Sequence, residues 1–194
     1  MKTNLLALGL IVVAALWRVA IVYHPALFNV APVTAFAFCG AAYFRDWRWW
    51  LLSIGALTLS DLWLNHYYAT QSGFTYSVGE MLFRAAAVAP AVAAGWLVSH
   101  RRTALTLLAG AVGGSLVFYL ATNSLAWLGD AYYAKTLAGW WQALTVGHPD
   151  YPSTVWFFRN TLVGDLAFTS LFSLALGAAG VRGGAKFAGG VAQA

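Results

Sequence analysis

Charged residues are scarce in this sequence. Lys, Arg, Asp and Glu make up 9% of its 194 residues, and hydrophobic residues make up 61%, whereas soluble domains carry roughly 25% charged residues. A chain with so few charged side chains cannot cover a water-exposed surface. The composition therefore excludes an ordinary soluble domain and predicts an integral membrane protein.

Cysteine is almost missing. The single Cys39 excludes an internal disulfide and any zinc or iron–sulfur site built from several cysteines. It lies among alanines in an apolar run, where a small buried hydrophobe is the ordinary interpretation and a soft-metal ligand is the alternative. His24, His66, His100 and His148 fall at the ends of apolar runs or between them, which disfavours a haem held between helices. We predict no metal and no cofactor.

Catalytic motifs and domain linkers are missing too. The sequence has no glycine-rich phosphate loop after a strand, no HExxH and no evident Ser/His/Asp set. We therefore predict that the protein is not an enzyme, with an intramembrane enzyme using Asp61 or Asp165 as the remaining alternative. No internal repeat, low-complexity stretch or Pro/Ser-rich linker divides the chain, so residues 1–194 form a single transmembrane domain.

Long apolar runs are what the sequence does have. A transmembrane helix needs about 20 apolar residues, within a range of about 17 to 25. Six runs qualify, some of them narrowly: Leu5–Val22, Val30–Phe44, Trp49–Leu64, Met81–Ser99, Ala104–Leu128 and Val155–Gly177. They predict an all-α bundle of six transmembrane helices. We interpret the first run as a span, because Arg18 interrupts the place where a signal-peptide cleavage site would lie.

The positive charges are distributed unevenly over the connections between the runs. One side of the predicted bundle holds Lys2, Arg45, Arg48, Arg101, Arg102, Arg182 and Lys186, and the other holds only Lys135. Because cytoplasmic connections are enriched in Lys and Arg, both termini are predicted to be cytoplasmic. This distribution also accounts for the formal charge of +5, so we assign no nucleic-acid partner.

The polar residues of the spans concentrate in the half of the bilayer opposite the termini. They are Arg18, Asn29, Asp61, Asn65, His66, Glu80, Arg84, Asn123, Arg159 and Asn160, with Asp165 deepest, near the middle. A charge at the bilayer centre costs about 2.5 to 3.5 kcal/mol, so such groups face a partner or a water-filled cavity. Two interpretations stay open. One is a network of salt bridges between helices, and the other is a binding cavity that opens outward. Glu80 and Arg84 are also spaced to pair on their own helix.

The connection between the fifth and sixth runs is rich in aromatic residues. The stretch "AYYAKTLAGWWQALTVG" places Tyr133, Leu137, Trp140, Trp141 and Leu144 on one face at helical spacing. This pattern predicts a short amphipathic helix that lies in the lipid interface or closes over a pocket.

Small residues recur at four-residue spacing in two of the predicted spans. Ala85, Ala89 and Ala93 form one such row, and Gly110 and Gly114 form another. The spacing predicts close helix packing, either within the bundle or against another membrane subunit.

Four stretches carry a resemblance to a known family. They are "NVAPVTAFAFCGAAYF" (29–44), "LSDLWLNHYY" (59–68), "ATNSLAWLGDAYY" (121–133) and "YPSTVWFFRNTLVGDLAFTSLF" (151–172). They resemble a group of uncharacterised bacterial membrane proteins that is similar to the substrate-binding S-components of energy-coupling-factor (ECF) transporters. The positions that match are Asn29 and Pro32, Ser60 and Asp61, Asn123 and Trp127, and Asn160, Gly164 and Asp165.

The resemblance implies a six-helix protein of the bacterial inner membrane that captures a vitamin or similar micronutrient from the outer side. The implied partners are this small molecule, membrane lipid and an ECF coupling module with two ATPases. The first span lacks the Ala-x-x-x-Ala pattern that S-components sharing a module often present, so a solitary S-component is an alternative. A non-transporting accessory subunit of a larger membrane complex is a second.

The expected ligand contacts follow from the polar cluster and the aromatic loops. Asp61, Asn123, Arg159 and Asp165 are the expected polar contacts, and Trp127, Trp140 and Trp141 are the expected stacking surfaces. The wider candidate site adds Asn29, Asn65, His66, Glu80, Arg84 and Asn160.

Overall fold

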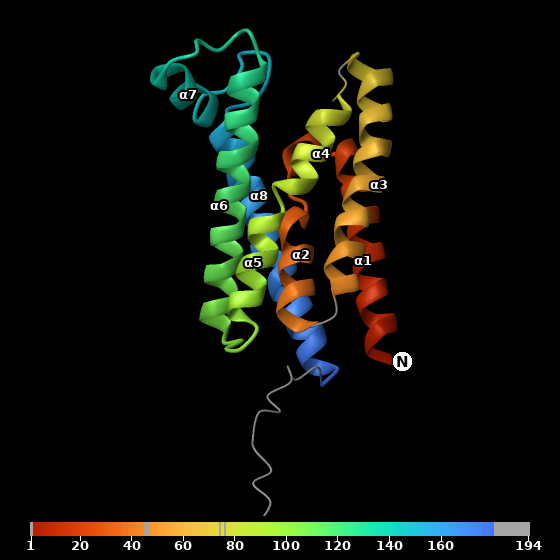
Figure 1. Ribbon diagram of the computed structural model, residues 1–194. Coiled ribbons are helices and arrows are strands. Elements are labelled where there is room, and N and C mark those ends of the chain that lie inside the picture. The colour runs from red at the N-terminus through yellow and green to blue at the C-terminus, as the bar shows by residue number, and fades with distance from the viewer. Residues whose placement is uncertain (1, 45–46, 74, 76, 181–194) are drawn as a thin grey trace, which may run out of the picture.

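The computed structural model describes residues 2–44, 47–73, 75 and 77–180. This part of the chain is helical and contains no strand. The helices are α1 (Lys2–Ala20), η1 (Ile21–Tyr23), η2 (Pro25–Leu27), α2 (Val33–Tyr43), α3 (Trp47–Ser72), α4 (Val78–Ala86), α5 (Ala89–Val98), α6 (Ala104–Gly129), α7 (Leu137–Leu144) and α8 (Thr154–Ala178). The long helices run roughly side by side, as Figure 1 shows.

Within the described residues, four segments are long and apolar enough to cross a membrane. They are Leu5–Tyr23, Val78–Val98, Ala104–Gly129 and Thr154–Ala178, and they match the first, fourth, fifth and sixth predicted runs. The other two runs differ from the expectation. The second contains an apolar helix of only 11 residues, α2. The third belongs to α3, a less apolar helix that continues past the predicted end at Leu64 as far as Ser72.

Helix α2 occupies the centre of the bundle. It packs against α3, α5, α6 and α8, and Ala35, Ala37 and Phe38 on it are completely buried. The approach of α5 is so close that a Cβ at Gly95 would lie 2.3 Å from the Phe38 carbonyl oxygen. A helix buried on all sides must be apolar all round, which explains why the second run carries no charged side chain.

The fourth predicted run forms two helices rather than one. Helix α4 ends at Ala86, Ala87 and Val88 form a turn, and α5 begins at Ala89. Pro90 explains the break, because its nitrogen has no proton to donate to the carbonyl four residues earlier and its ring clashes there. The two helices are visibly inclined to each other (Figure 1).

Helix α7 lies over the ends of α6 and α8 (Figure 1). The helix is shorter than the predicted apolar stripe, and the residues of the stripe are unevenly buried. Tyr133 precedes the helix and is buried with Leu144, whereas Leu137 is 82% exposed and Trp141 is 64% exposed. Helix α7 packs against α6. This packing buries Leu144 and leaves Leu137 and Trp141 exposed.

The connections separate cleanly between the two ends of the bundle. The N-terminus, the start of α3 and the α5–α6 connection share one end, which we call the basic end, and α7 and the α3–α4 connection lie at the other (Figure 1). Arg48, Arg101 and Arg102 therefore belong to the basic end. Arg45, Arg182 and Lys186 lie outside the described residues.

The small-residue rows are only partly buried. Gly110 and Gly114 on α6 face the Phe38 ring and Ala91, respectively, as close packing requires. In contrast, Ala89 and Ala93 are exposed, and α5 buries Ala91 and Gly95 instead. Two members of the predicted alanine row therefore lie on the outside of the bundle, whereas Ala85 is half-buried.

Candidate functional site

Asp165 lies near the middle of α8 and has no exposed surface. Its Oδ1 accepts hydrogen bonds from the backbone N–H groups of Thr34 (3.1 Å) and Ala35 (3.0 Å). Its Oδ2 accepts from the hydroxyls of Thr34 and Ser115, the latter at 2.7 Å. The carboxyl group therefore has four donors, all of them neutral, whereas a network of salt bridges between helices would give it a charged partner.

These contacts make Asp165 the cap of α2. The first N–H groups of a helix have no partner inside the helix, and its N-terminus carries a partial positive charge. The N-cap residue Pro32 has no side-chain hydrogen bond to offer, so a carboxyl group from α8 performs this task. Helix α2 is about 16 Å long, so its buried start needs such a partner within the protein.

Asn160 and Gly164 hold the irregular segment that precedes α2. The Asn160 side chain is 5% exposed, and its Nδ2 donates to the carbonyls of Phe28 (2.8 Å) and Ala26 (3.3 Å). A Cβ at Gly164 would lie 2.7 Å from the Ala31 nitrogen, so only glycine allows this approach. Irregular backbone at membrane depth is tolerated where protein satisfies its polar groups, and α8 does so here.

Two further residues shape the same segment. Trp17 on α1 donates from Nε1 to the Val30 carbonyl at 2.6 Å. Asn29 has a φ of 65°, a left-handed conformation that asparagine adopts more readily than most residues, and its side chain is exposed. Asn29 thus turns the chain toward α2. We call residues 26–35 with Asn160, Gly164 and Asp165 the α8 clamp.

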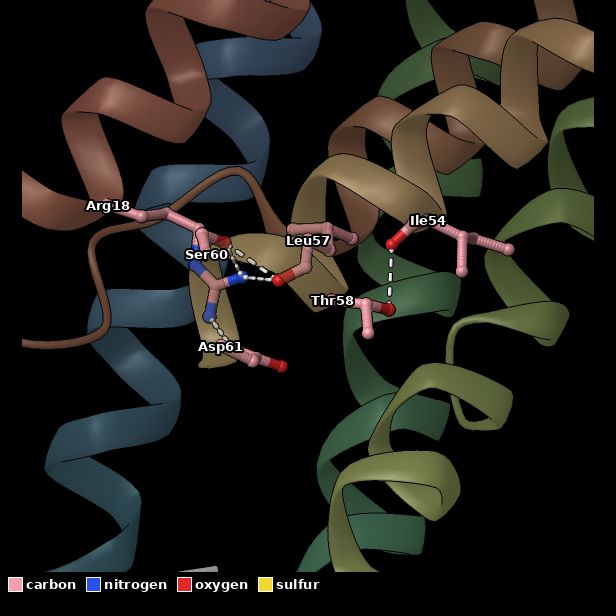
Figure 2. Close-up of polar contacts among 6 residues, drawn as sticks. All are labelled: Arg18, Ile54, Leu57, Thr58, Ser60 and Asp61. Carbon is pink, nitrogen blue, oxygen red and sulfur yellow. Dashed lines mark hydrogen bonds and ion pairs between the residues drawn. The ribbon is translucent and has the colours of Figure 1, made fainter. Parts of the chain in front are cut away.

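A second polar group joins α1 to α3 in the half of the bundle opposite the basic end. Arg18 is 5% exposed, and Figure 2 shows its guanidinium reaching to α3. One nitrogen donates to Ser60 Oγ (2.9 Å) and the Leu57 carbonyl (3.3 Å), and another forms an ion pair with Asp61. This pair matches the salt-bridge interpretation, and it leaves the second Asp61 oxygen turned away from Arg18 (Figure 2).

A cavity of about 10 Å³ adjoins this ion pair. Its walls come from α1, α3, α4, the α4–α5 turn and α6. They are formed by Arg18, Ile54, Leu57, Thr58, Asp61, Arg84, Ala85, Val88 and Phe118. We call it the Arg18–Arg84 cavity. The ionisable groups of its lining are the guanidiniums of Arg18 and Arg84 and the carboxylate of Asp61.

Another cavity, of about 30 Å³, lies nearer the basic end and is lined mainly by apolar residues of α1, α2, α3 and α8, including Cys39 and Phe172. Pockets for small molecules measure about 300 to 1,000 Å³, so neither cavity holds more than a water molecule or two in this conformation.

Among the described residues, no group of three His, Cys, Asp or Glu side chains is placed to hold a metal ion.

Two charged candidates, Glu80 and Arg159, contact neighbouring residues of the chain near the starts of α4 and α8. Glu80 is exposed and forms a capping box with Ser77, whose backbone N–H donates to Glu80 Oε2 at 2.7 Å. Arg159 is exposed. Its guanidinium donates to Asn160 Oδ1 at 3.1 Å and lies 5.6 Å from the Trp156 ring. Neither side chain lines the Arg18–Arg84 cavity.

The aromatic candidates hold the α6–α7 connection in place. Trp127 Nε1 donates to the Ala134 carbonyl and Trp140 Nε1 to Ser124 Oγ, both at 2.8 Å. Asn123 donates to the Tyr119 carbonyl on its own helix at 2.8 Å. Trp141 is exposed. These contacts fix α7 against α6.

The structure thus divides the sequence-predicted site into separate groups. Asn160 and Asp165 belong to the α8 clamp, Asp61 and Arg84 to the Arg18–Arg84 cavity, and the tryptophans to the α7 region. Asn65 is half-buried and His66 exposed, both beyond Asp61 on α3. Three residues that donate hydrogen bonds in the α8 clamp were not predicted from the sequence: Trp17, Thr34 and Ser115. The hydroxyls of Thr34 and Ser115 gave no signal because single Thr and Ser residues are common in apolar helices.

A sequence model described as "Family of unknown function (DUF6580)" matches residues 1–186. The chain belongs to this family. No curated protein and no solved structure matches it. The family description assigns no function to this DUF6580 member.

Proposed function

We propose that the protein is a substrate-capture membrane protein of the S-component type, which takes up a small vitamin-like molecule from the outer side of the bacterial inner membrane. The observation that carries the proposal is the Arg18–Arg84 cavity. Charged side chains from three helices converge there, in the half of the bundle away from the basic end. Ionisable groups inside membrane segments often mark substrate paths, and a buried salt bridge contributes little net stability.

The proposal includes six membrane crossings. In this reading α1, α3, α6 and α8 each cross once, α4 and α5 together form a broken fourth crossing, and η1, η2 and α2 form a discontinuous second crossing. Helix α7 lies in the outer interface, where its exposed Trp141 suits the headgroup level. Both termini are cytoplasmic, which agrees with the gathering of Arg48, Arg101 and Arg102 at one end.

Within this proposal the α8 clamp supports the site rather than binding the ligand. In transporters, N-termini of half-helices point at anionic groups of the substrate. Here the Asp165 carboxyl fills that position on α2. Asp165 and Asn160 therefore fix α2 as a rigid wall, and the ligand contacts are Asp61 and Arg84, joined by Arg18.

Capture requires the Arg18–Arg84 cavity to enlarge. Helix α4 is the element suited to move, because it has nine residues, packs mainly on α3 and is separated from α5 by the Ala87–Val88 turn. Its outward displacement would open the cavity between α4 and α6 while the tightly packed α2, α5 and α8 stay in place.

The direct test is native mass spectrometry of gently extracted protein. The proposal predicts a co-purified small molecule that is lost when Arg84 is changed to Gln and retained when Arg101, at the basic end, is changed to Gln. Protein that carries no small molecule and takes up none from a concentrated extract of the host cell would contradict the proposal.

The orientation can be tested separately. Cys39 is buried, so it gives little background to thiol reagents. A Trp141→Cys variant is expected to react with a membrane-impermeant maleimide in intact cells, and an Arg101→Cys variant only after lysis. The reverse pattern would contradict cytoplasmic termini.

A second candidate function is that of an accessory subunit in a larger membrane complex. It is favoured by small residues on the outside of the bundle: Ala89 and Ala93 are exposed, and a Cβ at Gly9, Gly55 or Gly113 would meet nothing within 4 Å. Small residues permit close approach of another helix. A stable stoichiometric complex that holds no small molecule would favour this candidate, whereas an ECF coupling module among the partners would favour capture.

A further inference from the structure

A short connection, residues 99–103 with the sequence SHRRT, joins α5 to α6 at the basic end of the bundle (Figure 1). We call it the basic connection. It links two of the segments that are long and apolar enough to cross a membrane, Val78–Val98 and Ala104–Gly129. Because a bilayer places its headgroups at the ends of such segments, Arg101 and Arg102 lie at the depth of the lipid phosphates.

The backbone of the basic connection is fixed by hydrogen bonds. The Arg101 N–H donates to the Val98 carbonyl at 3.0 Å, and the Arg101 carbonyl accepts from the Thr106 hydroxyl. Thr103 and Thr106 also form a capping box at the start of α6. The two arginines therefore extend from an ordered turn, and such preorganisation lowers the entropy cost of holding a ligand.

The two arginines differ in their contacts. Arg102 is half-buried, and it donates to the Ala42 carbonyl in the last turn of α2 at 3.4 Å while its guanidinium lies 4.9 Å from the Tyr43 ring. A cation at this place complements the partial negative charge at the end of α2. The Arg101 side chain is exposed. A guanidinium has five N–H donors, so the contact with Ala42 leaves most donors of Arg102 for other acceptors.

Exposed apolar side chains flank the basic connection on both sides. Leu97, at the end of α5, is 80% exposed, and Leu105, in the first turn of α6, is 79% exposed. Trp96 is exposed as well, and tryptophan favours the membrane interface. An apolar surface thus begins directly beside the arginines, as it must for a molecule that has both a charged headgroup and acyl chains.

Acidic side chains are distributed away from this end. Those of the described residues are Asp61, Glu80, Asp130, Asp150 and Asp165, and all of them lie in the middle or the opposite half of the bundle. Among the described residues, the basic end therefore carries positive charge only. Charge complementarity favours a partner with a net negative charge.

From this arrangement we propose that the basic connection binds an anionic phospholipid, with its phosphate held by Arg101 and Arg102 and its acyl chains along Leu97 and Leu105. The planar fork of N–H donors in arginine matches phosphate oxygens, and basic sites beside membrane helices bind anionic headgroups. Free phosphate would satisfy the arginines alone, whereas a lipid also covers the leucines. The inference does not rest on the proposed function, because the Arg18–Arg84 cavity lies in the other half of the bundle.

The test compares phosphatidylglycerol with phosphatidylcholine of the same acyl chains. Each lipid is titrated into the purified full chain in detergent, and the bound lipid is counted by native mass spectrometry. We expect phosphatidylglycerol to bind at least about fivefold more tightly than phosphatidylcholine, the effect of one favourable charge near a membrane surface. Inorganic phosphate at the concentration of the lipid should not displace it.

Variants locate the lipid. Arg101→Gln should weaken phosphatidylglycerol binding by about fivefold and leave phosphatidylcholine binding unchanged. The matched control Arg101→Lys keeps the charge and should stay within about twofold of the unchanged protein. Arg159→Gln removes an exposed arginine from the opposite end and should also have little effect. Circular dichroism and gel filtration establish that each variant is folded.

Several results would overturn the inference. They are equal binding of the two lipids, phosphatidylglycerol binding that Arg101→Gln does not change, and a loss in Arg159→Gln as large as that in Arg101→Gln. Displacement of the lipid by inorganic phosphate would also overturn it, because it would identify a site for the free anion.

Discussion

Replacement of Asp165 by Ala tests the α8 clamp most directly. The change removes the acceptor for four donors. The Ser115 hydroxyl can still donate to the Ala111 carbonyl, 2.9 Å away, and the Thr34 hydroxyl lies 3.5 Å from Ser115 Oγ. The backbone N–H groups of Thr34 and Ala35 have no such substitute, because they point at Asp165 from the first turn of a buried helix.

Two buried N–H groups without partners cost about 1 to 3 kcal/mol each, so Asp165→Ala should lower the free energy of unfolding by about 2 to 6 kcal/mol. Asp165→Asn is the matched control. Its side-chain oxygen can still accept from both N–H groups, and its amide can donate to the two hydroxyl oxygens. We expect a loss within about 1 kcal/mol for this variant.

The free energies are measured by SDS titration of the purified protein in mixed micelles, followed by circular dichroism. An Asp165→Ala variant within about 1 kcal/mol of the unchanged protein would refute the reasoning, because it would mean that the start of α2 does not depend on the α8 carboxyl group. An Asn variant as unstable as the Ala variant would show that the negative charge, rather than the hydrogen-bonding shape, is what α2 requires.

Two further predictions concern packing and charge. Gly164→Ala places a Cβ 2.7 Å from a backbone nitrogen of the segment before α2, and overpacking of this kind lowers the free energy of unfolding by about 1 to 3 kcal/mol. The control Gly113→Ala, whose Cβ meets nothing within 4 Å, should leave the free energy of unfolding unchanged in the same SDS titration. Equal effects of the two variants would contradict the close approach at Gly164. Arg18→Leu or Asp61→Leu alone leaves a buried charge unpaired and should cost about 3 to 5 kcal/mol. The double variant should recover most of that loss in a double-mutant cycle, and additive losses would show that the two side chains do not act as a pair.

The apolar runs predicted the helical class and most helix positions because burial in lipid imposes a length and composition that can be read without tertiary contacts. They did not predict that the second run, already one of the shortest, would contain a helix of only 11 residues, or that the fourth run would break. Pro90 was visible in the sequence, yet a proline in a membrane helix produces either a kink or a break depending on its neighbours. The start of α2 depends on Asp165, 131 positions away from Thr34, and no local pattern reports such a contact.

The polar residues were recognised as unusual, and the sequence placed them in the correct half of the bundle, but their partners could not be read from it. Asp165 pairs with hydroxyls and backbone amides, and Asn160 with backbone carbonyls. Backbone groups are present at every position, so they give no compositional signal. Arg18 and Asp61 were both recognised as candidates for a salt bridge between helices, but their pairing with each other became known only from the structure.

The two parts of the α8 clamp, residues 26–35 and the α8 residues Asn160, Gly164 and Asp165, lie far apart along the chain. This separation has a consequence for biosynthesis. Residues 26–35 leave the ribosome long before Asn160 and Asp165, so the exposed carbonyls and amides of this stretch must wait for the last helix before they are satisfied. Until then α2 has reason to remain outside the lipid interior or to be shielded by the insertion machinery. A chain that stops before α8 should therefore be recognised as unfinished and degraded, although helices α1 to α7 would already be made.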